Sequence, residues 1–330
     1  MEIRIKIVTG DATKISVDVL ALKYAQANYG LDTLVTRILR GGGRDASLMQ
    51  PKPGGFRLVE GVAELAARQV LFVGVVSLYA FGYPEIREFS RRVLSALAGS
   101  AAAIQRVALT LHGANYGLDE LEAFESEIAG IVDSIRTLDF PEKLSEILFV
   151  EGNRGRAIRL QKHLVKLLPS GTISTAPADR GSESRPEDGE RLRSAGYSSS
   201  SKEHVFVAMP FKEDMDDTYH YGIQGVVREA GFLCERADLS SFTGDVMQWV
   251  RDRIKTAKLV VADLTDGNPN VYLEVGYAWG CSVPTVLLVK DTEDLKFDVR
   301  SQRCLQYKKI KDLEESLAKE LKELRKHGKI

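Results

Sequence analysis

The sequence contains only three cysteines, and no two of them form a Cys-x-x-Cys pair. Cys234, Cys281 and Cys304 are widely spaced and odd in number, which argues against a cysteine-based zinc site and a disulfide framework. This cysteine usage fits a reducing compartment. We therefore expect a cytoplasmic protein without a structural metal.

Long apolar runs and an excess of one charge are also missing. No run approaches the length that spans a bilayer, and the first residues, MEIRIKIVTGD, lack the apolar core of a signal peptide. The formal net charge is −1, which argues against a polyanion-binding surface as the main feature. Neither a membrane nor a nucleic acid is therefore expected as the principal partner.

Glycine-rich phosphate-binding motifs are absent as well. Neither GxxxxGK[ST] nor GxGxxG occurs, so the Gly41–Gly43 run is interpreted as a turn. The 330 residues exceed what one compact core usually organises, which favours two domains. Residues 169–203 are rich in Ser, Gly, Pro and charge, and predict a flexible linker between domains 1–168 and 204–330. A long loop within one domain is the alternative.

The N-terminal part alternates short apolar runs with amphipathic stretches. The runs IRIKIV, VDVLALKY, QVLFVGVV, RVALTL and EILFVEG are typical of buried strands, and the segments between several of them have helical periodicity. This alternation predicts a layered α/β domain with a largely parallel sheet.

A hexapeptide, ANYGLD, occurs twice in this part, at residues 27–32 and 114–119. Each copy follows a strand and precedes a helix, so both would lie at the carboxyl edge of the sheet, where ligands bind. Asn28, Gly30, Asn115 and Gly117 are therefore candidate ligand-binding residues, because glycine permits close backbone approach and helix N-termini attract anions. The alternative is favourable turn chemistry used twice.

The order GDATKISVDVLAL, QVLFVGV and VALTLHGANYG resembles macro-type domains and the related N-terminal domain of leucine aminopeptidases. This resemblance covers roughly residues 1–168 and implies a three-layer α/β/α domain that binds ADP-ribose-like nucleotides. The family's Asn-Ala-Ala-Asn signature is replaced by LALKYAQAN. A structural or oligomerising domain is therefore the competing interpretation.

The C-terminal part predicts five strands separated by helices. HVFVAMPF, GFLCERA, KLVVADL, PTVLLVK and a short segment near CLQYK would be the strands. About 125 residues of this pattern indicate a parallel sheet in the flavodoxin-like order 2-1-3-4-5. A ligand would then bind between the first and third strands, at their carboxyl ends.

One carboxylate is placed unexpectedly near that crevice. Glu274 lies in the apolar helix NPNVYLEVGYAWG, four residues after Asn270 and therefore on the same helical face. Asn268 is a natural N-cap and Pro269 a natural first-turn residue. A buried carboxylate without a basic neighbour has a raised pKa and is a candidate functional group.

VFVAMPF, KLVVADLTDGNPNVYLEVGYAWG and FDVRSQRCLQY resemble the nucleoside 2-deoxyribosyltransferase-like branch of TIR-related folds. The resemblance implies that Glu274 is the catalytic carboxylate and that Asp263 and Asn270 bind sugar hydroxyls or orient it. The remaining candidate substrate-binding residues are Met209, Pro210, Phe211, Asp266, Asn268 and Arg303.

The chemistry and the resemblance together predict a nucleotide N-glycosidase, with NAD as a possible substrate and no cofactor or metal. The N-terminal domain would sense a nucleotide or drive assembly of a homo-oligomer, a pairing that would suit an NADase effector of bacterial anti-phage defence. One alternative is a deoxyribosyltransferase or nucleoside hydrolase of salvage. Another is a non-catalytic nucleotide-binding module.

Overall fold

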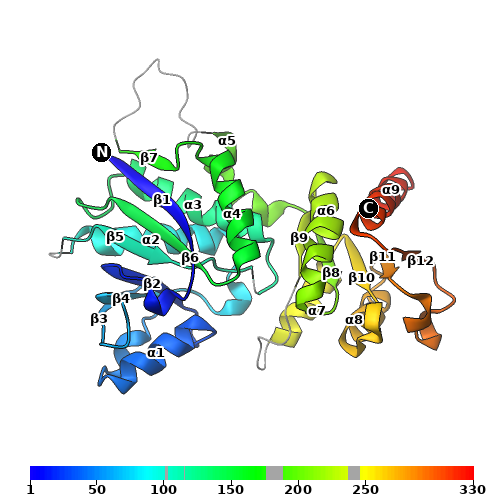
Figure 1. Ribbon diagram of the computed structural model, residues 1–330, viewed down its shortest axis with the longest axis horizontal. Helices are drawn as coiled ribbons and strands as arrows, with labels where there is room; N and C mark the ends of the chain where they lie inside the picture. The colour runs from blue at the N-terminus through cyan, green and yellow to red at the C-terminus, as the bar shows by residue number, and fades with distance from the viewer. Residues whose placement is uncertain (101–102, 115, 176–188, 237–245) are drawn as a thin grey trace, which may run out of the picture. The chain divides into compact units, whose positions relative to one another are not determined.

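The computed structural model describes residues 1–100, 103–114, 116–175, 189–236 and 246–330. The chain divides into two compact units. Unit 1 comprises Met1–Ala114 and Glu120–Ser200, and unit 2 comprises Asn115–Asp119 and Ser201–Ile330. Each unit is an α/β structure built on its own sheet (Figure 1).

In the described part of unit 1, seven strands form one sheet in the order β3-β4-β2-β5-β6-β1-β7. The five inner strands pair in parallel, whereas β3 and β7 join the two edges antiparallel. The predicted alternation of strands and helices is therefore confirmed. The strands are β1 (Glu2–Thr9), β2 (Val19–Tyr24), β3 (Phe56–Glu60), β4 (Gln69–Gly74), β5 (Arg106–Leu109), β6 (Glu146–Glu151) and β7 (Thr172–Ser174).

Helices cover the first sheet because its strands are apolar on both faces. Leu22 of β2 and Phe72 of β4 are fully buried, and they share one core cluster with Val35 and Leu39 of the first helix. The helices of unit 1 are α1 (Leu31–Gly41), α2 (Tyr83–Ala98), α3 (Glu120–Arg136), α4 (Arg154–Leu167) and α5 (Glu190–Ser194).

The segment expected to be a flexible linker belongs largely to unit 1, which corrects the sequence-based prediction. Strand β7 pairs with β1, and α5 packs near α3. Arg87 of α2 pairs with Asp133 at 2.7 Å and donates through Nη1 to the backbone carbonyls of Leu192, Arg193 and Ala195. Tertiary partners of this kind are invisible in a polar, low-complexity sequence. Residues 176–188 of the predicted linker lie outside the described residues.

Unit 2 contains a five-stranded sheet in the order β12-β11-β10-β8-β9, with all neighbouring strands parallel. Numbered along the chain, this is the predicted order 2-1-3-4-5, which is therefore confirmed. The strands are β8 (His204–Ala208), β9 (Leu233–Glu235), β10 (Leu259–Asp263), β11 (Thr285–Val289) and β12 (Cys304–Gln306).

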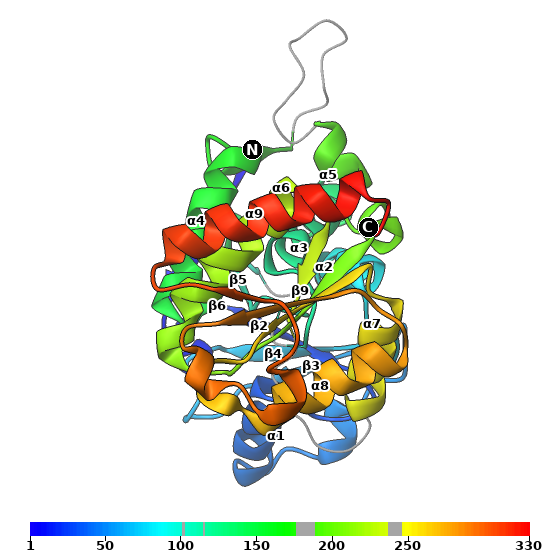
Figure 2. The same cartoon turned by 90° about the vertical axis from the view of Figure 1, so that its right-hand side faces the viewer.

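Two pairs of helices cover opposite faces of the second sheet. Residues of α6 (Gly225–Glu229) and α9 (Ile310–Lys326) share a core cluster with Val205 and Val207 of β8. Residues of α7 (Val246–Thr256) and α8 (Pro269–Gly280) share another cluster with Phe206. Figure 2 shows α9 on one side of the sheet and α7 and α8 on the other. A π-helical segment, Thr218–Gln224, leads into α6.

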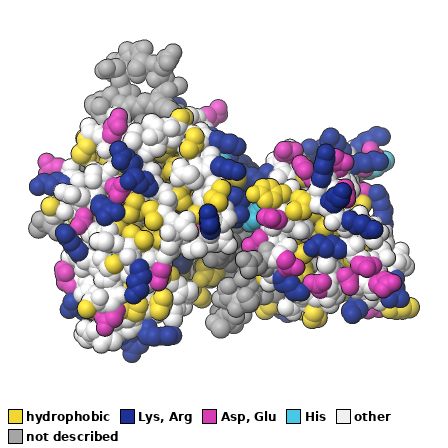
Figure 3. Space-filling view, in the orientation of Figure 1, with side chains coloured by type: hydrophobic (Ala, Val, Ile, Leu, Met, Phe, Trp, Pro, Cys, Tyr) yellow, Lys and Arg dark blue, Asp and Glu magenta, His cyan; other side chains and the backbone are white. Residues whose placement is uncertain are grey.

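The surface carries both signs of charge. On the face shown in Figure 3, Lys and Arg side chains are interspersed with Asp and Glu side chains. Within the part of the chain that the structure describes, no helix has both the length and the apolar character needed to cross a bilayer.

Candidate functional site

The candidate site is built on α8, which begins with a well-formed N-cap. The side chain of Asn268 accepts a hydrogen bond from the backbone N–H of Asn270 at 3.0 Å, and Pro269 occupies the first helical position. Both residues fulfil the predicted roles, because they satisfy or remove amide groups that the first helical turn leaves unpaired. This cap fixes where the following turns of α8 place their side chains.

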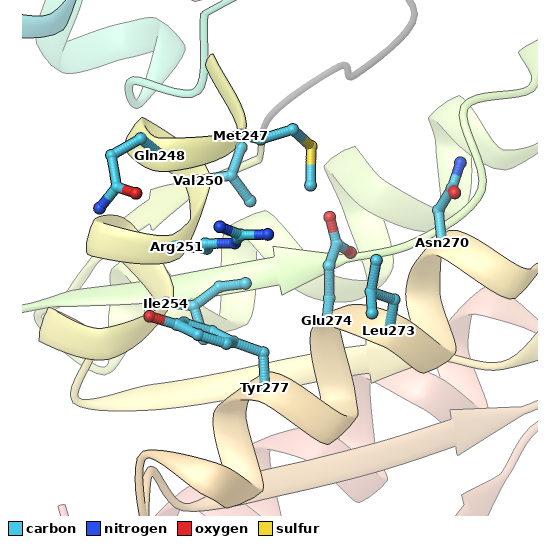
Figure 4. A pocket seen from close by; sticks show the side chains of 9 residues that line it. All are labelled: Met247, Gln248, Val250, Arg251, Ile254, Asn270, Leu273, Glu274 and Tyr277. Atoms are coloured by element: carbon cyan, nitrogen blue, oxygen red, sulfur yellow. The ribbon is translucent and has the colours of Figure 1, made fainter. Parts of the chain in front are cut away.

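A pocket of about 560 Å³ lies between α7 and α8. Asn270 and Glu274 both line it, so the prediction that they share a helical face is confirmed (Figure 4). Its volume lies within the range of about 300 to 1,000 Å³ that is typical of small-molecule sites. The lining residues are Met247, Gln248, Val250, Arg251, Ile254, Asn270, Leu273, Glu274 and Tyr277.

Glu274 is the buried polar group of this pocket. Glu274 is only 7% exposed to solvent. In the described part of the chain, its carboxyl group has no hydrogen-bond or ion-pair partner. Burial disfavours the charged carboxylate and raises the pKa of Glu274 from an ordinary value of 4.5 to about 8. A carboxyl group with this pKa changes its protonation state near neutral pH, as acid–base and electrostatic catalysts do.

Asp263 is placed differently from Glu274. It is fully buried at the end of β10 and does not belong to the pocket lining. Its Oδ1 accepts from the backbone N–H of Thr265 at 3.0 Å, and its Oδ2 accepts from the hydroxyl of Tyr307 at 2.6 Å. Burial, followed by the charge of Asp263, raises the pKa of Tyr307. Oδ1 therefore holds the loop that leads to α8, and Oδ2 joins β10 to the residue that follows β12.

The predicted first loop also lies outside the pocket lining. Met209 belongs to the core cluster on the α6 and α9 side of the sheet, and Pro210 is buried. Phe211 is 39% exposed, and the guanidinium of Arg236 lies 4.3 Å from its ring centroid. None of these three residues lines the pocket with Glu274.

Two other predicted substrate-binding residues make ion pairs elsewhere in unit 2. Asp266 pairs with Lys212 at 2.6 Å and has a positive φ of 64° in the turn before α8. Arg303 pairs with Glu320 at 2.6 Å, and its side chain is 76% exposed. Neither residue lines the pocket with Glu274.

The residues that sequence reasoning missed come mainly from α7. Met247 and Arg251 are four residues apart and line the pocket from one helical face. Val250 and Ile254 of the same helix are buried and also belong to the core. In the sequence, the only sign of this part of the site is Arg251, a cation that directly follows the apolar Val250. Its position in the pocket with Glu274 depends on how α7 packs beside α8.

The first ANYGLD copy belongs to unit 1, whereas all of the second copy except Ala114 is assigned to unit 2, and a ligand site at these turns stays a prediction. In the first copy, Gly30 caps α1 with φ 51°, and Asn28 Oδ1 is buried without a hydrogen-bond partner among the described residues. In the second copy, Gly117 has φ 93°, and a β-carbon there would clash with the ring of Trp249. Asn115 lies outside the described residues.

Metal-binding clusters are not found among the described residues, where no group of three His, Cys, Asp or Glu side chains is placed to hold an ion. The acidic side chains near α8 instead act as backbone acceptors and ion-pair partners.

No family model matches the chain, and no curated protein matches it. Among solved structures, a Trypanosoma brucei macrodomain in complex with ADP is 18% identical over 49% of this chain and 69% of its own, with a TM-score of 0.40. A Clostridium botulinum CMP N-glycosidase is 22% identical over 35% of this chain and 97% of its own, with a TM-score of 0.29. The macro domain of ganglioside induced differentiation associated protein 2 is 15% identical over 49% of this chain and 83% of its own, with a TM-score of 0.38.

Proposed function

We propose that unit 2 is an N-glycosidase that cleaves the bond between ribose and base in a nucleotide, and that NAD is its substrate. The observation that carries this proposal is Glu274, a buried carboxyl group without a partner in the described residues, which faces a pocket of small-molecule size. The motif around Glu274 supports the same chemistry through its resemblance to the deoxyribosyltransferase-like branch.

Cleavage breaks the bond from the anomeric carbon to the base nitrogen, and the bonding electron pair leaves with nitrogen. Positive charge then develops on the anomeric carbon and the ring oxygen. The ionised carboxylate of Glu274 can stabilise this charge, or it can form an ester with the anomeric carbon. Water then adds its hydroxyl group to that carbon and releases a proton; on the ester route this breaks the bond from the anomeric carbon to the Glu274 oxygen and restores the free carboxylate.

A pyridinium nucleotide suits this pocket because its leaving group carries a positive charge before the bond breaks. A cation close to Glu274 favours the ionised carboxylate and so lowers the pKa of about 8 that burial produces. Nicotinamide leaves as a neutral molecule, so no proton donor for the leaving group is needed. Asn270, at the mouth of the same pocket, is proposed to contact a sugar hydroxyl.

The other predicted roles are part of the same proposal. We propose that Asp263 orients the loop before α8, and that Met209, Pro210, Phe211, Asp266, Asn268 and Arg303 support substrate binding from outside the pocket lining. Unit 1 is proposed to sense an ADP-ribose-like nucleotide or to drive homo-oligomer assembly. A cytoplasmic NADase controlled in this way would serve bacterial anti-phage defence.

Incubation of the full chain with NAD, nucleoside monophosphates and deoxynucleosides, followed by mass spectrometry, tests the proposal. NAD hydrolysis gives nicotinamide and ADP-ribose. Transfer of deoxyribose between bases would instead identify a transferase, and base release from nucleosides alone would identify a salvage hydrolase. Binding without any bond cleavage would identify a nucleotide-binding module and contradict the proposal.

A further inference from the structure

Arg251 occupies a distinctive position in the pocket. Of the described residues that line it, Arg251 is the only one with a cationic side chain. Figure 4 shows its guanidinium extending from α7 toward the space in front of Glu274. A ligand that fills a pocket of about 560 Å³ would therefore meet a positive charge on one wall and a buried carboxyl group on the other.

Three other polar side chains of α7, those of Gln248, Asp252 and Arg253, are engaged with protein groups. Arg253 donates to Glu235 at 2.7 Å, and Gln248 donates to Asp252 at 3.2 Å. Arg251 makes no ion pair or side-chain hydrogen bond with any described residue, and it is exposed to solvent. An exposed, unpaired arginine is ordinary on a protein surface. Its position in the same pocket as Glu274 is what makes it informative.

Arg251 is not the counterion of Glu274. Burial alone accounts for the raised pKa of Glu274, without a contribution from Arg251. The pKa of Tyr277 is raised by burial, and the charge of Arg251 opposes that rise. Among the described residues no ion pair or hydrogen bond joins the guanidinium to Glu274, so both groups face the pocket as separate partners for a ligand. A ribose phosphate could contact both groups at once, because its anomeric carbon and its phosphate lie at opposite ends of the molecule.

We infer that Arg251 is a specificity-determining residue that binds a phosphate group of the substrate while Glu274 faces the anomeric carbon. The inference rests on the proposed function and deepens it, because it makes phosphorylated nucleosides the preferred substrates over nucleosides. The planar guanidinium presents parallel N–H donors that match two phosphate oxygens. Bound phosphate would also neutralise Arg251, the one cationic side chain among the described residues of the pocket lining.

Matched substrates test the inference, since nicotinamide riboside and nicotinamide mononucleotide differ only in the phosphate. The measurement is kcat/KM for both compounds and for NAD with the full chain and its Arg251→Gln and Arg251→Lys variants. Lys255→Gln is the control, because it removes an exposed cation of α7 that does not line the pocket. Melting temperatures show whether each variant is folded.

Arg251→Gln is expected to lower kcat/KM for the mononucleotide by about 10- to 100-fold, the size expected for losing hydrogen bonds to a charged group. Activity toward the riboside should change less than about twofold, and Arg251→Lys should recover part of the loss because it keeps the charge. Lys255→Gln should resemble the wild type. A loss for NAD but not for the mononucleotide would place the pyrophosphate, rather than a terminal phosphate, on Arg251.

Equal losses for the riboside and the phosphorylated substrates would overturn the inference, as would no loss for any substrate. If the wild type cleaves none of them, the proposed function fails by itself. Calorimetric titration with AMP and adenosine then decides the role of Arg251. Weaker AMP binding in Arg251→Gln with unchanged adenosine binding supports the phosphate contact, whereas equal AMP binding in both proteins contradicts it.

Discussion

Arg251 and Glu274 line one pocket from neighbouring helices, and no ion pair joins them in the described part of the chain. The pocket therefore keeps a buried carboxyl group and a separate cation, each available to a ligand. A direct ion pair would have lowered the pKa of Glu274 and satisfied both groups internally. Their separation is consistent with a site that is completed by its substrate.

The raised pKa of Glu274 predicts how the stability of unit 2 depends on pH. The folded state binds this proton up to about pH 8, whereas the unfolded chain releases it near the ordinary value of 4.5. The free energy of unfolding should therefore fall as pH rises between these values, by at most about 1.4 kcal/mol per pH unit, and then level off.

Glu274→Gln removes this titration, so the variant should be more stable than the wild type above pH 8. Both tryptophans of the chain, Trp249 and Trp279, belong to unit 2, so urea unfolding followed by their fluorescence reports this unit. Glu314→Gln on the exposed side of α9 is the matched control. A wild type whose stability relative to the variant does not change from pH 5 to pH 9 would show that Glu274 is not perturbed.

Catalysis should have the opposite pH dependence from stability, because the proposed reaction needs the ionised carboxylate. We expect kcat/KM for NAD to rise about tenfold per pH unit below the pKa of Glu274 and to level off above about 8. Steady-state rates from pH 5.5 to pH 9.5 measure this profile. A rate that falls above pH 8 would indicate that Glu274 acts as a proton donor.

The hydrogen bond from Tyr307 to Asp263 predicts a structural effect that is separable from catalysis. Tyr307→Phe leaves the fully buried Oδ2 of Asp263 without this donor, so unit 2 should lose about 1 to 3 kcal/mol of stability. Tyr221→Phe, at a 57% exposed position, should cost almost nothing. Urea unfolding followed by tryptophan fluorescence compares them, and equal midpoints would contradict the structural role.

Arg87 predicts an effect on the segment that contains α5 and the residues after it. Arg87→Gln breaks its pair with Asp133 and removes donors from three backbone carbonyls, so residues 190–200 should exchange amide hydrogens at least about tenfold faster. Hydrogen exchange with mass spectrometry measures this segment directly. Arg40→Gln, on the exposed side of α1, serves as the control. Unchanged exchange in Arg87→Gln would show that other contacts hold the segment.

Much of the fold is predictable from the sequence because local patterns and topology agree. The apolar run KLVVADL folds as the central strand β10, and Asn268 caps α8 as its residue type predicts. The strand order of unit 2 follows from five short parallel strands with helical crossovers. Glu274 stands out because a carboxylate in an apolar helix must face either a partner or a ligand.

The remaining features depend on contacts between distant residues. Strand β7 forms because Ile173 pairs with Ile3 of β1, a partner that the polar segment itself does not reveal. Asp263 matches a motif position, but the hydroxyl of Tyr307 and the amide of Thr265 occupy its oxygens. Arg251 joins the site only through the packing of α7 beside α8. Such relationships are properties of tertiary structure and leave little trace in local sequence.

The most direct test of the central claim is nicotinamide release from NAD by the wild type and by Glu274→Gln at pH 8.5, with melting temperatures measured in parallel. The claim predicts that the variant melts at or above the wild-type temperature and loses at least about 1,000-fold in kcat, because a neutral amide cannot stabilise the developing cation. Glu314→Gln should retain wild-type turnover. A folded Glu274→Gln protein that keeps turnover within tenfold of the wild type would contradict the claim.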